Sequence, residues 1–170
     1  MNDSSQIQTR RDFLKTSALA GGILAAPALL PGNLFAKSNS DTPKVGLIGC
    51  GGRGSGAADQ ALKADDNVIL TAVADAFPEP LQASLGNLKT KHPDKVKVTP
   101  DTQFVGLDAY QKLIDSGVDV VLLATPPGFR PVHLKAAIDA GKHVFCEKPM
   151  ATDVPGVHSV MESAKKAKEK

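Results

Sequence analysis

Apolar runs alternate with stretches of helical spacing from residue 44 to the C-terminus. The apolar runs are short and rich in β-branched and aliphatic residues, which is typical of buried strands. They fall at residues 45–49, 67–75, 103–105, 118–125 and 143–147, and residues 95–98 form a further short extended piece. The stretches between them predict helices at residues 55–63, 80–91 and 131–140, a helix capped by Asp108, and a last helix capped by Asp153.

This alternation predicts an α/β fold, a Rossmann-type doubly wound parallel sheet with right-handed crossovers. Ligands of such sheets bind beyond the carboxyl ends of the strands, near the point where the strand order reverses. The candidate functional residues are therefore those that follow the strands, at residues 49–54, 75, 125–128 and 146–149.

Composition limits the classes of protein that remain. The chain has 170 residues, of which 22% are charged, and its formal net charge is +2. These values describe one ordinary soluble domain. No basic block interleaves with aromatic residues, so we expect no nucleic-acid partner. The lysine-rich C-terminus is read as a solvated helix face.

The first 36 residues carry the pattern of an export signal. Thr9-Arg-Arg-Asp-Phe-Leu-Lys15 precedes an apolar, small-residue stretch at 17–30 and resembles the bacterial twin-arginine motif. A membrane anchor is disfavoured because glycines and prolines interrupt the stretch. We therefore expect a signal peptide at 1–36, cleaved after Ala36, and a linker at 37–43. The twin-arginine machinery would export the protein, to the periplasm in a bacterium.

A glycine-rich turn follows the first predicted strand. Gly49, Gly51 and Gly54 have the G-x-G-x-x-G spacing of a strand that turns into a helix and binds a pyrophosphate. Gly52, Gly54 and Ala57 offer a second register, G-x-G-x-x-A. The first register is preferred because the apolar run stops at Gly49. By itself the pattern is weak, since glycine-rich turns are common.

Asp75 strengthens the case for a dinucleotide. It closes the second strand 21 residues after Gly54, where an acidic residue accepts hydrogen bonds from the ribose hydroxyls and repels a 2′-phosphate. Asp75 therefore favours NAD over NADP, although Arg53 leaves NADP open. The alternative role of Asp75 is that of an ordinary residue in the turn before Pro78.

Two cysteines raise the question of a disulfide. Cys50 follows the first strand and Cys146 lies on the fifth, so the expected strand order separates them by two spacings, about 10 Å. That exceeds the roughly 7 Å limit on the Cα separation in a disulfide. We expect two free thiols that line or back the site. No Cys/His cluster has metal-ligand spacing, so no metal site is predicted.

A family resemblance gives these residues roles. Ala140-Gly-Lys-His-Val-Phe-Cys-Glu-Lys-Pro-Met-Ala151 resembles the A-G-K-H-V-x-x-E-K-P-x-A motif of the glucose–fructose oxidoreductase/inositol dehydrogenase (Gfo/Idh/MocA) family. Thr125-Pro126 matches the T-P loop of that family. On spacing alone, His133 would be a helix residue packed on the sheet and Lys148 the end of a strand.

The resemblance implies a complete set of cofactor contacts. The glycine turn would hold the pyrophosphate through Gly49, Gly51, Gly52, Arg53 and Gly54, and Asp75 would hold the adenosine ribose. Thr125, Pro126 and His133 would lie on the nicotinamide side. Glu147 and Lys148 would meet the nicotinamide ribose, and Lys148 would also be catalytic and reach the reacting hydroxyl of the substrate.

The chain departs from the family pattern in two places. The usual loop is T-P-N-x-x-H, whereas here residues 127–132 displace His133 by three positions. Arg130 in this longer loop is assigned a substrate contact. Family members are also substantially longer, and their second domain supplies the substrate pocket and an acid/base histidine. The C-terminal substrate domain is thus absent from this chain, which by itself is expected to be inactive.

The resemblance leaves three functions open. The first is an exported NAD(P)-dependent oxidoreductase that acts on a sugar, polyol or related cyclic alcohol, with its cofactor loaded before export and tightly held. The second is an NAD-dependent glycosidase or lyase that oxidises a sugar transiently. The third is a dinucleotide-binding module without turnover. The complete protein is expected to be a homo-oligomer.

Overall fold

A computed structural model describes residues 42–169 of the protein, so the predicted signal peptide and most of the linker lie outside the described residues. The strands are β1 (Lys44–Ile48), β2 (Ile69–Asp75), β3 (Gln103–Val105), β4 (Val120–Leu123) and β5 (His143–Cys146). The helices are α2 (Gly52–Ala64), α3 (Pro78–Lys91), α4 (Ala109–Asp115), α5 (Arg130–Asp139) and α6 (Val154–Lys168), with a short 3-10 helix, η1 (Pro100–Thr102).

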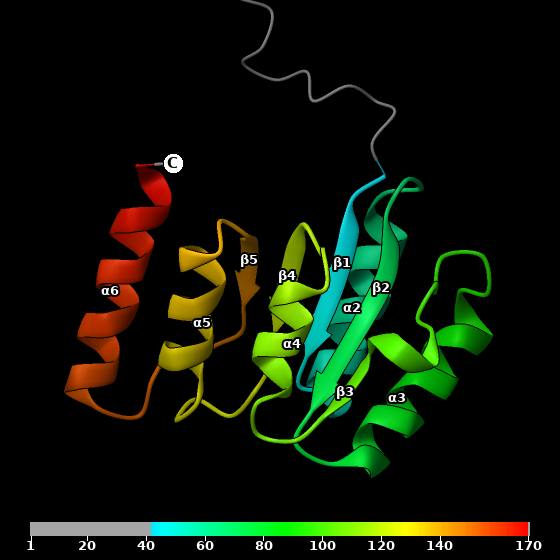
Figure 1. Cartoon of the computed structure of the whole chain (residues 1–170), viewed down its shortest axis with the longest axis horizontal. Helices are drawn as coiled ribbons and strands as arrows, with labels where there is room; N and C mark the ends of the chain where they lie inside the picture. Colours follow the sequence, from blue (N-terminus) through cyan, green and yellow to red (C-terminus); the bar gives the residue numbers. More distant parts are fainter. Residues whose placement is uncertain (1–41, 170) are drawn as a thin grey trace, which may run out of the picture. The chain divides into compact units, whose positions relative to one another are not determined.

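The five strands form one parallel sheet in the order β3-β2-β1-β4-β5 (Figure 1). The chain winds outward from β1 to β3 in one direction and from β4 to β5 in the other. The strand order therefore reverses between β1 and β4, and the carboxyl ends of these two strands frame the crevice in which doubly wound folds bind ligands. The predicted fold class is confirmed.

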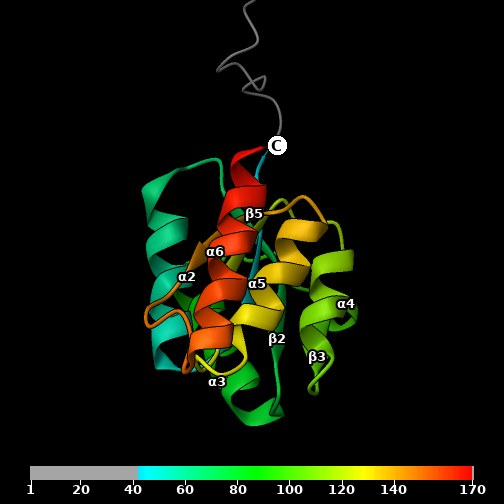
Figure 2. The ribbon, with the colours of Figure 1, turned by 90° about the vertical axis from the view of Figure 1, so that its left-hand side faces the viewer.

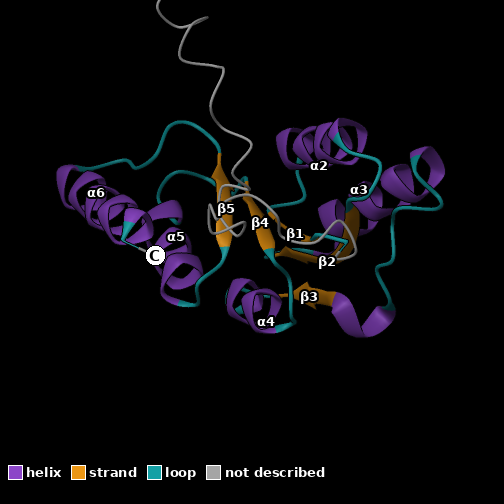
Figure 3. Cartoon of the chain, turned by 90° about the horizontal axis from the view of Figure 1, so that it is seen from above, coloured by secondary structure: helices purple, strands orange, loops and turns teal. Residues whose placement is uncertain are grey.

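Helices cover both faces of the sheet, as seen along its edge in Figure 3. Leu47 and Val73 lie on the face that packs against α2 and α3. The alternate residues Ile48, Ala72 and Ala74 lie on the opposite face, which α4 and α5 cover. Because strand side chains alternate between faces, both sets are apolar and both are buried, as expected for a parallel sheet.

The last helix, α6, packs mainly on α5 and lies over it in Figure 2. Its start is fixed as predicted, because the carboxylate of Asp153 accepts a hydrogen bond of 2.7 Å from the N–H of Gly156. Asp139, at the end of α5, accepts hydrogen bonds from Lys135 and, across the helix pair, from Lys166. These two ammonium groups lower the pKa of Asp139 to about 2.

Three local expectations were inaccurate. Helix α2 begins at Gly52, three residues before the predicted start, because the second half of the glycine turn is already helical. Residues 95–98 contribute an isolated bridge between Val96 and Leu70 and no strand. Asp108 precedes α4, but its side chain pairs with Lys112 and caps no helix N–H group, because its own backbone is already helical.

Candidate functional site

The glycine turn follows the first of the two registers. Gly49 has a φ of 92°, which disfavours residues with a side chain, and a Cβ there would lie 2.8 Å from backbone atoms of Ala124 and Thr125. A Cβ on Gly54 would overlap the carbonyl oxygen of Gly49, so this glycine lets the first turn of α2 pack against the end of β1. By contrast, a Cβ on Gly51 would meet nothing within 4 Å.

The open space above Gly51 lies at the N-terminus of α2. Gly51 is the N-cap residue and provides no side-chain cap. The N–H groups of Gly52, Arg53 and Gly54 have no acceptor in the preceding turn of the helix, and none of them donates to another backbone carbonyl within residues 42–169. Free N–H groups at a helix N-terminus suit an anion such as a phosphate.

Asp75 is bonded directly to this turn. Its Oδ2 accepts a hydrogen bond of 2.7 Å from the N–H of Cys50, and its Oδ1 accepts one of 3.0 Å from the N–H of Phe77. The two amides fix the plane of the carboxylate at the carboxyl end of β2. An ionised carboxylate has about four acceptor positions, so positions remain for two further donors such as vicinal hydroxyl groups.

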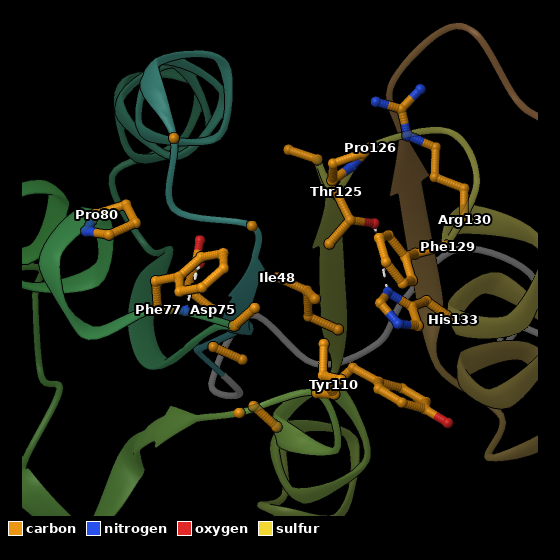
Figure 4. A pocket seen from close by; sticks show the side chains of 18 residues that line it. Ile48, Asp75, Phe77, Pro80, Tyr110, Thr125, Pro126, Phe129, Arg130 and His133 are labelled. Atoms are coloured by element: carbon orange, nitrogen blue, oxygen red, sulfur yellow. Dashed lines mark hydrogen bonds between the residues drawn. The ribbon is translucent and has the colours of Figure 1, made fainter.

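A cavity of about 590 Å³ lies at the carboxyl ends of the strands, a volume that suits a small-molecule or cofactor site. Figure 4 shows Asp75 and Phe77 on one side of it, and Thr125, Phe129 and His133 on the other. The lining residues lie at the ends of four strands or in the segments that follow them. They are residues 48, 49 and 51 for β1, 74–77 and 80 for β2, 106, 107, 109 and 110 for β3, and 124–126, 129, 130 and 133 for β4.

His133 belongs to the cavity wall despite the longer loop before it. Its Nδ1 lies 3.3 Å from Thr125 Oγ1, within hydrogen-bond distance, and its ring stacks on that of Tyr110 with a centroid separation of 4.1 Å. The side chain is only 8% exposed. This burial lowers the pKa of His133 to about 4, so the imidazole is neutral at neutral pH and can take part in hydrogen bonds without carrying charge.

A second group of polar residues lies beside β5, outside the residues that line the cavity. Arg53 at the start of α2 forms an ion pair with Glu147, whose side chain is buried. The hydrogen bond from Arg53 lowers the pKa of Glu147. Lys148 is exposed, and no hydrogen bond or ion pair joins its side chain to another residue in the range 42–169. The Lys148–Pro149 peptide bond is cis.

The structure thus divides the predicted site residues into two groups. Six line the cavity, namely Gly49, Gly51, Asp75, Thr125, Pro126 and His133. Gly52, Arg53, Gly54, Glu147 and Lys148 do not line it. Arg130, for which a substrate contact was predicted, also lines the cavity. It is 5% exposed, and its Nη1 donates to the main-chain carbonyls of Glu147 and Pro149.

Sequence reasoning missed one wall of the cavity. Phe77, Pro80, Leu107 and Tyr110 line it, and Phe77 and Leu107 are 65% and 75% exposed. Exposed large apolar side chains beside a cavity provide surfaces for a flat apolar group. The signal available in the sequence was their place directly after the second and third apolar runs, where ligands of such sheets bind.

Both cysteines are free thiols, and β4 lies between the strands that carry or precede them. Burial raises the pKa of the Cys50 thiol to about 12, and the nearby carboxylate of Asp75 adds to this shift. Burial also raises the pKa of Cys146. Neither thiol is therefore activated as a nucleophile. Within residues 42–169, no three His, Cys, Asp or Glu side chains converge as metal ligands.

A parallel doubly wound sheet with a glycine turn and an acidic strand end at its switch point defines a dinucleotide-binding Rossmann domain. Residues 43–170 match the family described as an oxidoreductase family with an NAD-binding Rossmann fold. The chain therefore belongs to the Gfo/Idh/MocA family, and the predicted resemblance is confirmed. Helices within residues 42–169 are all too short or too polar to cross a membrane.

The chain is similar to proteins with two kinds of name. A glycosyl hydrolase family 109 protein of Shewanella pealeana is 30% identical over 92% of this chain and 37% of its own length. An inositol 2-dehydrogenase/D-chiro-inositol 3-dehydrogenase of Lactiplantibacillus plantarum is 33% identical over 72% of this chain and 32% of its own length. The chain thus spans about a third of the length of these relatives.

Solved structures show the same fold. The WlbA dehydrogenase of Bordetella pertussis, solved in complex with NADH and UDP-GlcNAcA, has a TM-score of 0.59 and 28% identity, over 76% of this chain and 34% of that one. A probable dehydrogenase of Thermotoga maritima has a TM-score of 0.56 and 30% identity, over 74% of this chain and 34% of that one.

Proposed function

We propose that this chain is the NAD-binding part of an enzyme that transfers a hydride between NAD and a carbinol carbon of a sugar, polyol or related cyclic alcohol. One observation carries the proposal. The carboxylate of Asp75 is hydrogen-bonded to the glycine turn through Cys50, so a group that binds ribose hydroxyls and a group that binds a phosphate share one end of one cavity.

The residues present fit such a cofactor. The open N-terminus of α2 and the side-chain-free Gly51 would accept the pyrophosphate, with Gly49 and Gly54 shaping the turn and Gly52 and Arg53 supplying donors. Asp75 would hold the adenosine ribose. The exposed side chains of Phe77 and Leu107 would enclose the adenine from either side.

The other end of the cavity would take the nicotinamide. Thr125, Pro126 and the neutral His133 form its wall, and the bond between Thr125 and His133 fixes the Thr125 hydroxyl. Glu147 and Lys148 are proposed to contact the nicotinamide ribose, with Glu147 held in place by Arg53. NAD is preferred over NADP in this proposal, because the Asp75 carboxylate would repel a 2′-phosphate.

Lys148 is the proposed catalytic residue of this chain. Bound NAD would supply the hydride acceptor or donor at the nicotinamide ring. The Lys148 ammonium would orient the reacting hydroxyl of the substrate and polarise it by donating a hydrogen bond. In this proposal Lys148 acts as the donor, Glu147 is paired with Arg53, and a base from elsewhere in the complete enzyme would remove the proton. The chain alone is accordingly proposed to bind the cofactor without turnover.

A second candidate function is an NAD-dependent glycosidase or lyase. It is favoured by the relative from Shewanella pealeana, whose alignment covers 92% of this chain. Residues 42–170 make up only about three quarters of the chain. That similarity therefore extends into the predicted signal peptide. In this mechanism a sugar is oxidised only transiently, the glycosidic bond is eliminated, and the nicotinamide returns to its starting state. The same cavity and the same Lys148 would serve both reactions.

Product analysis of the complete enzyme separates the two candidates. In a single turnover, with no second substrate present to reoxidise the cofactor, the dehydrogenase should convert one bound NAD to NADH for each substrate oxidised. The glycosidase should release aglycone without a net change in bound NADH. Replacing Lys148 with alanine should abolish turnover in either case and change the dissociation constant for NADH by less than about threefold. The exposed Lys97 provides the control, since Lys97→Ala should leave turnover unchanged. Normal turnover in Lys148→Ala would remove this lysine from the mechanism.

The location of the complete enzyme is part of the proposal. The twin-arginine motif at residues 9–15 would direct a folded protein out of the cytoplasm. Because an exported enzyme has no ready supply of NAD, the cofactor would be loaded before export, held tightly and recycled in place. The complete enzyme is further proposed to be a homo-oligomer. Dialysis of the exported enzyme should leave stoichiometric nicotinamide bound, and loss of the nicotinamide would argue against this arrangement.

A further inference from the structure

Hydrogen bonds and an ion pair from neighbouring residues hold the turn at residues 147–149, whereas the side chain of Lys148 is exposed. The N–H of Glu147 donates a hydrogen bond of 3.0 Å to the carbonyl of Leu123 at the end of β4. The carboxylate of Glu147 pairs with Arg53. The carbonyls of Glu147 and Pro149, on either side of Lys148, both accept hydrogen bonds from Arg130.

Arg130 makes these bonds from the first residue of α5 and from a buried position. Its side chain is 5% exposed, and Nη1 lies 2.7 Å from the carbonyl oxygen of Glu147. The Nε of Arg130 is buried without a partner. Leaving a buried donor unsatisfied costs free energy, and the two hydrogen bonds that Arg130 does make both go to the turn around Lys148.

The positive charge of Arg130 strengthens its bonds to the turn. Hydrogen bonds from a guanidinium to a carbonyl are charge-assisted and stronger than neutral ones. The positive charge of Arg130 also acts on the carboxylate of Glu147 and contributes to its lowered pKa, after the larger effect of Arg53. Two arginines from two different helices, α2 and α5, therefore hold the residue that precedes Lys148.

The bonds from Arg130 reach a turn that follows the last strand of the described sheet. Strand β5 is an edge strand within residues 42–169, since it pairs with β4 alone. The residues that continue it beyond Cys146 therefore have a neighbouring strand on one side only. Arg130 belongs to the longer segment between Thr125 and His133, at the point where the loop passes into α5. The segment that displaces His133 therefore also supplies the bonds to the turn.

We propose that Arg130 is a positioning residue for Lys148. By holding the carbonyls before and after Lys148, it fixes the backbone of this residue and thereby the region that its ammonium group can reach. This inference rests on the proposed function for the role of Lys148, whereas the effect of Arg130 on the order of the turn does not depend on it. In this role the guanidinium acts on Lys148 through the main chain of the turn.

The first test measures the turn in the cofactor-free chain by ¹⁵N relaxation. In the native protein, the order parameters of the Lys148 and Met150 amides should be near the rigid value of about 0.85, and in Arg130→Met they should fall below about 0.6. Lys135→Met is the matched control, because it removes a cation from the exposed side of the same helix. Arg130→Gln, too short to reach both carbonyls, should behave like Arg130→Met and serves if the latter does not fold.

The second test asks whether a disturbed turn affects Lys148 at the cofactor site. Lysines are reductively ¹³C-methylated, the Lys148 signal is assigned with Lys148→Arg, and NADH is added. We expect a shift of this signal in the native protein. In Arg130→Met the shift should be lost, while the dissociation constant for NADH stays within about threefold of the native value. In Arg130→Lys, which keeps a charged donor, the shift should return in part.

The outcomes distinguish the two proposals. Unchanged order parameters in both Arg130→Met and Arg130→Gln would overturn the role of Arg130, whatever the cofactor. An unchanged NADH-induced shift of the Lys148 signal in these variants would do the same. Failure of the native chain to bind NADH would instead overturn the proposed function, and the relaxation data would still decide whether Arg130 orders the turn.

Discussion

A Cβ atom on Gly54 would overlap the carbonyl oxygen of Gly49. The contact joins the first turn of α2 to the end of β1, so an added methyl group can be accommodated only by shifting backbone. We expect Gly54→Ala to lower the free energy of unfolding by about 1–3 kcal/mol, in the range of overpacked core substitutions. Thermal unfolding followed by circular dichroism measures the change.

The same helix provides the control for this substitution. A Cβ on Gly56 would meet nothing within 4 Å, and alanine favours a helix over glycine by up to about 1 kcal/mol. Gly56→Ala should therefore leave stability unchanged or raise it. Equal destabilisation by both substitutions would mean that the two glycines do not differ in their packing.

Gly51→Ala separates binding from stability. No atom lies near a Cβ at this position, and the residue has an ordinary φ of −63°, so the chain should fold with a nearly unchanged melting temperature. The methyl group would nevertheless occupy the space over the open N-terminus of α2. We expect NADH to bind at least about tenfold more weakly, as measured by fluorescence titration. Gly86→Ala in α3 is the control, and equal affinity in both variants would place the pyrophosphate elsewhere.

Asp75→Asn tests the choice between the two cofactors. The amide keeps an acceptor oxygen for only one of the two N–H groups, of Cys50 or of Phe77, and turns an NH2 group toward the other. It also removes the charge that would repel a 2′-phosphate. We expect weaker binding of NADH, by about tenfold, and a higher affinity for NADPH relative to NADH. Titrating both nucleotides at the same ionic strength gives the ratio. A ratio that does not move would mean that Asp75 does not face the ribose.

Burial of His133 predicts a pH dependence of stability. Its pKa is lowered to about 4, below the usual value near 6.5 for an unfolded chain. Between these values the unfolded chain binds a proton that the folded protein does not. Stability is therefore full above about pH 6.5 and falls as the pH decreases towards 4, by roughly 2 kcal/mol.

His133→Phe should remove most of this loss, because phenylalanine can keep the stack on Tyr110 and does not titrate. Urea unfolding at pH 7.0 and at pH 4.5 measures the difference in each protein. The aspartates with lowered pKa values, Asp59, Asp108 and Asp139, lose their contributions only below about pH 4, outside this window. The lowered pKa of Glu147 adds a loss that begins near pH 4.5 and is the same in both proteins, so the difference between them reports His133. The same pH slope in both proteins would assign the dependence to other groups.

The sequence predicted the sheet well because each strand is specified locally. The runs that became β1, β2 and β4 consist mainly of aliphatic and β-branched residues that are apolar on both faces, as buried parallel strands require. Strand β5, His-Val-Phe-Cys, is less regular, and its His143 and Phe145 are exposed. The order of the strands followed from the alternation with helices, and the glycine register followed from where the first run stops. These features require no knowledge of distant contacts.

What the sequence did not reveal depends on contacts between distant segments. Arg130 looked like a loop residue open to the substrate. It does line the cavity, but nothing in the sequence indicated that its side chain is mostly buried and bonded to the carbonyls of Glu147 and Pro149. Phe77 and Leu107 form one wall of the cavity only because β2 and β3 end side by side. Neither relationship leaves a spacing pattern that could be recognised along the chain.

The position of β5 at the edge of the sheet has a consequence for engineering. Within residues 42–169 the outward N–H and C=O groups of this strand pair with no other strand, so they can accept an added strand through main-chain hydrogen bonds. Lys148 continues directly from β5. In this chain of 170 residues, a peptide designed to extend the sheet at this edge would therefore stiffen the backbone leading to Lys148 and so allow the cofactor site to be modulated from outside.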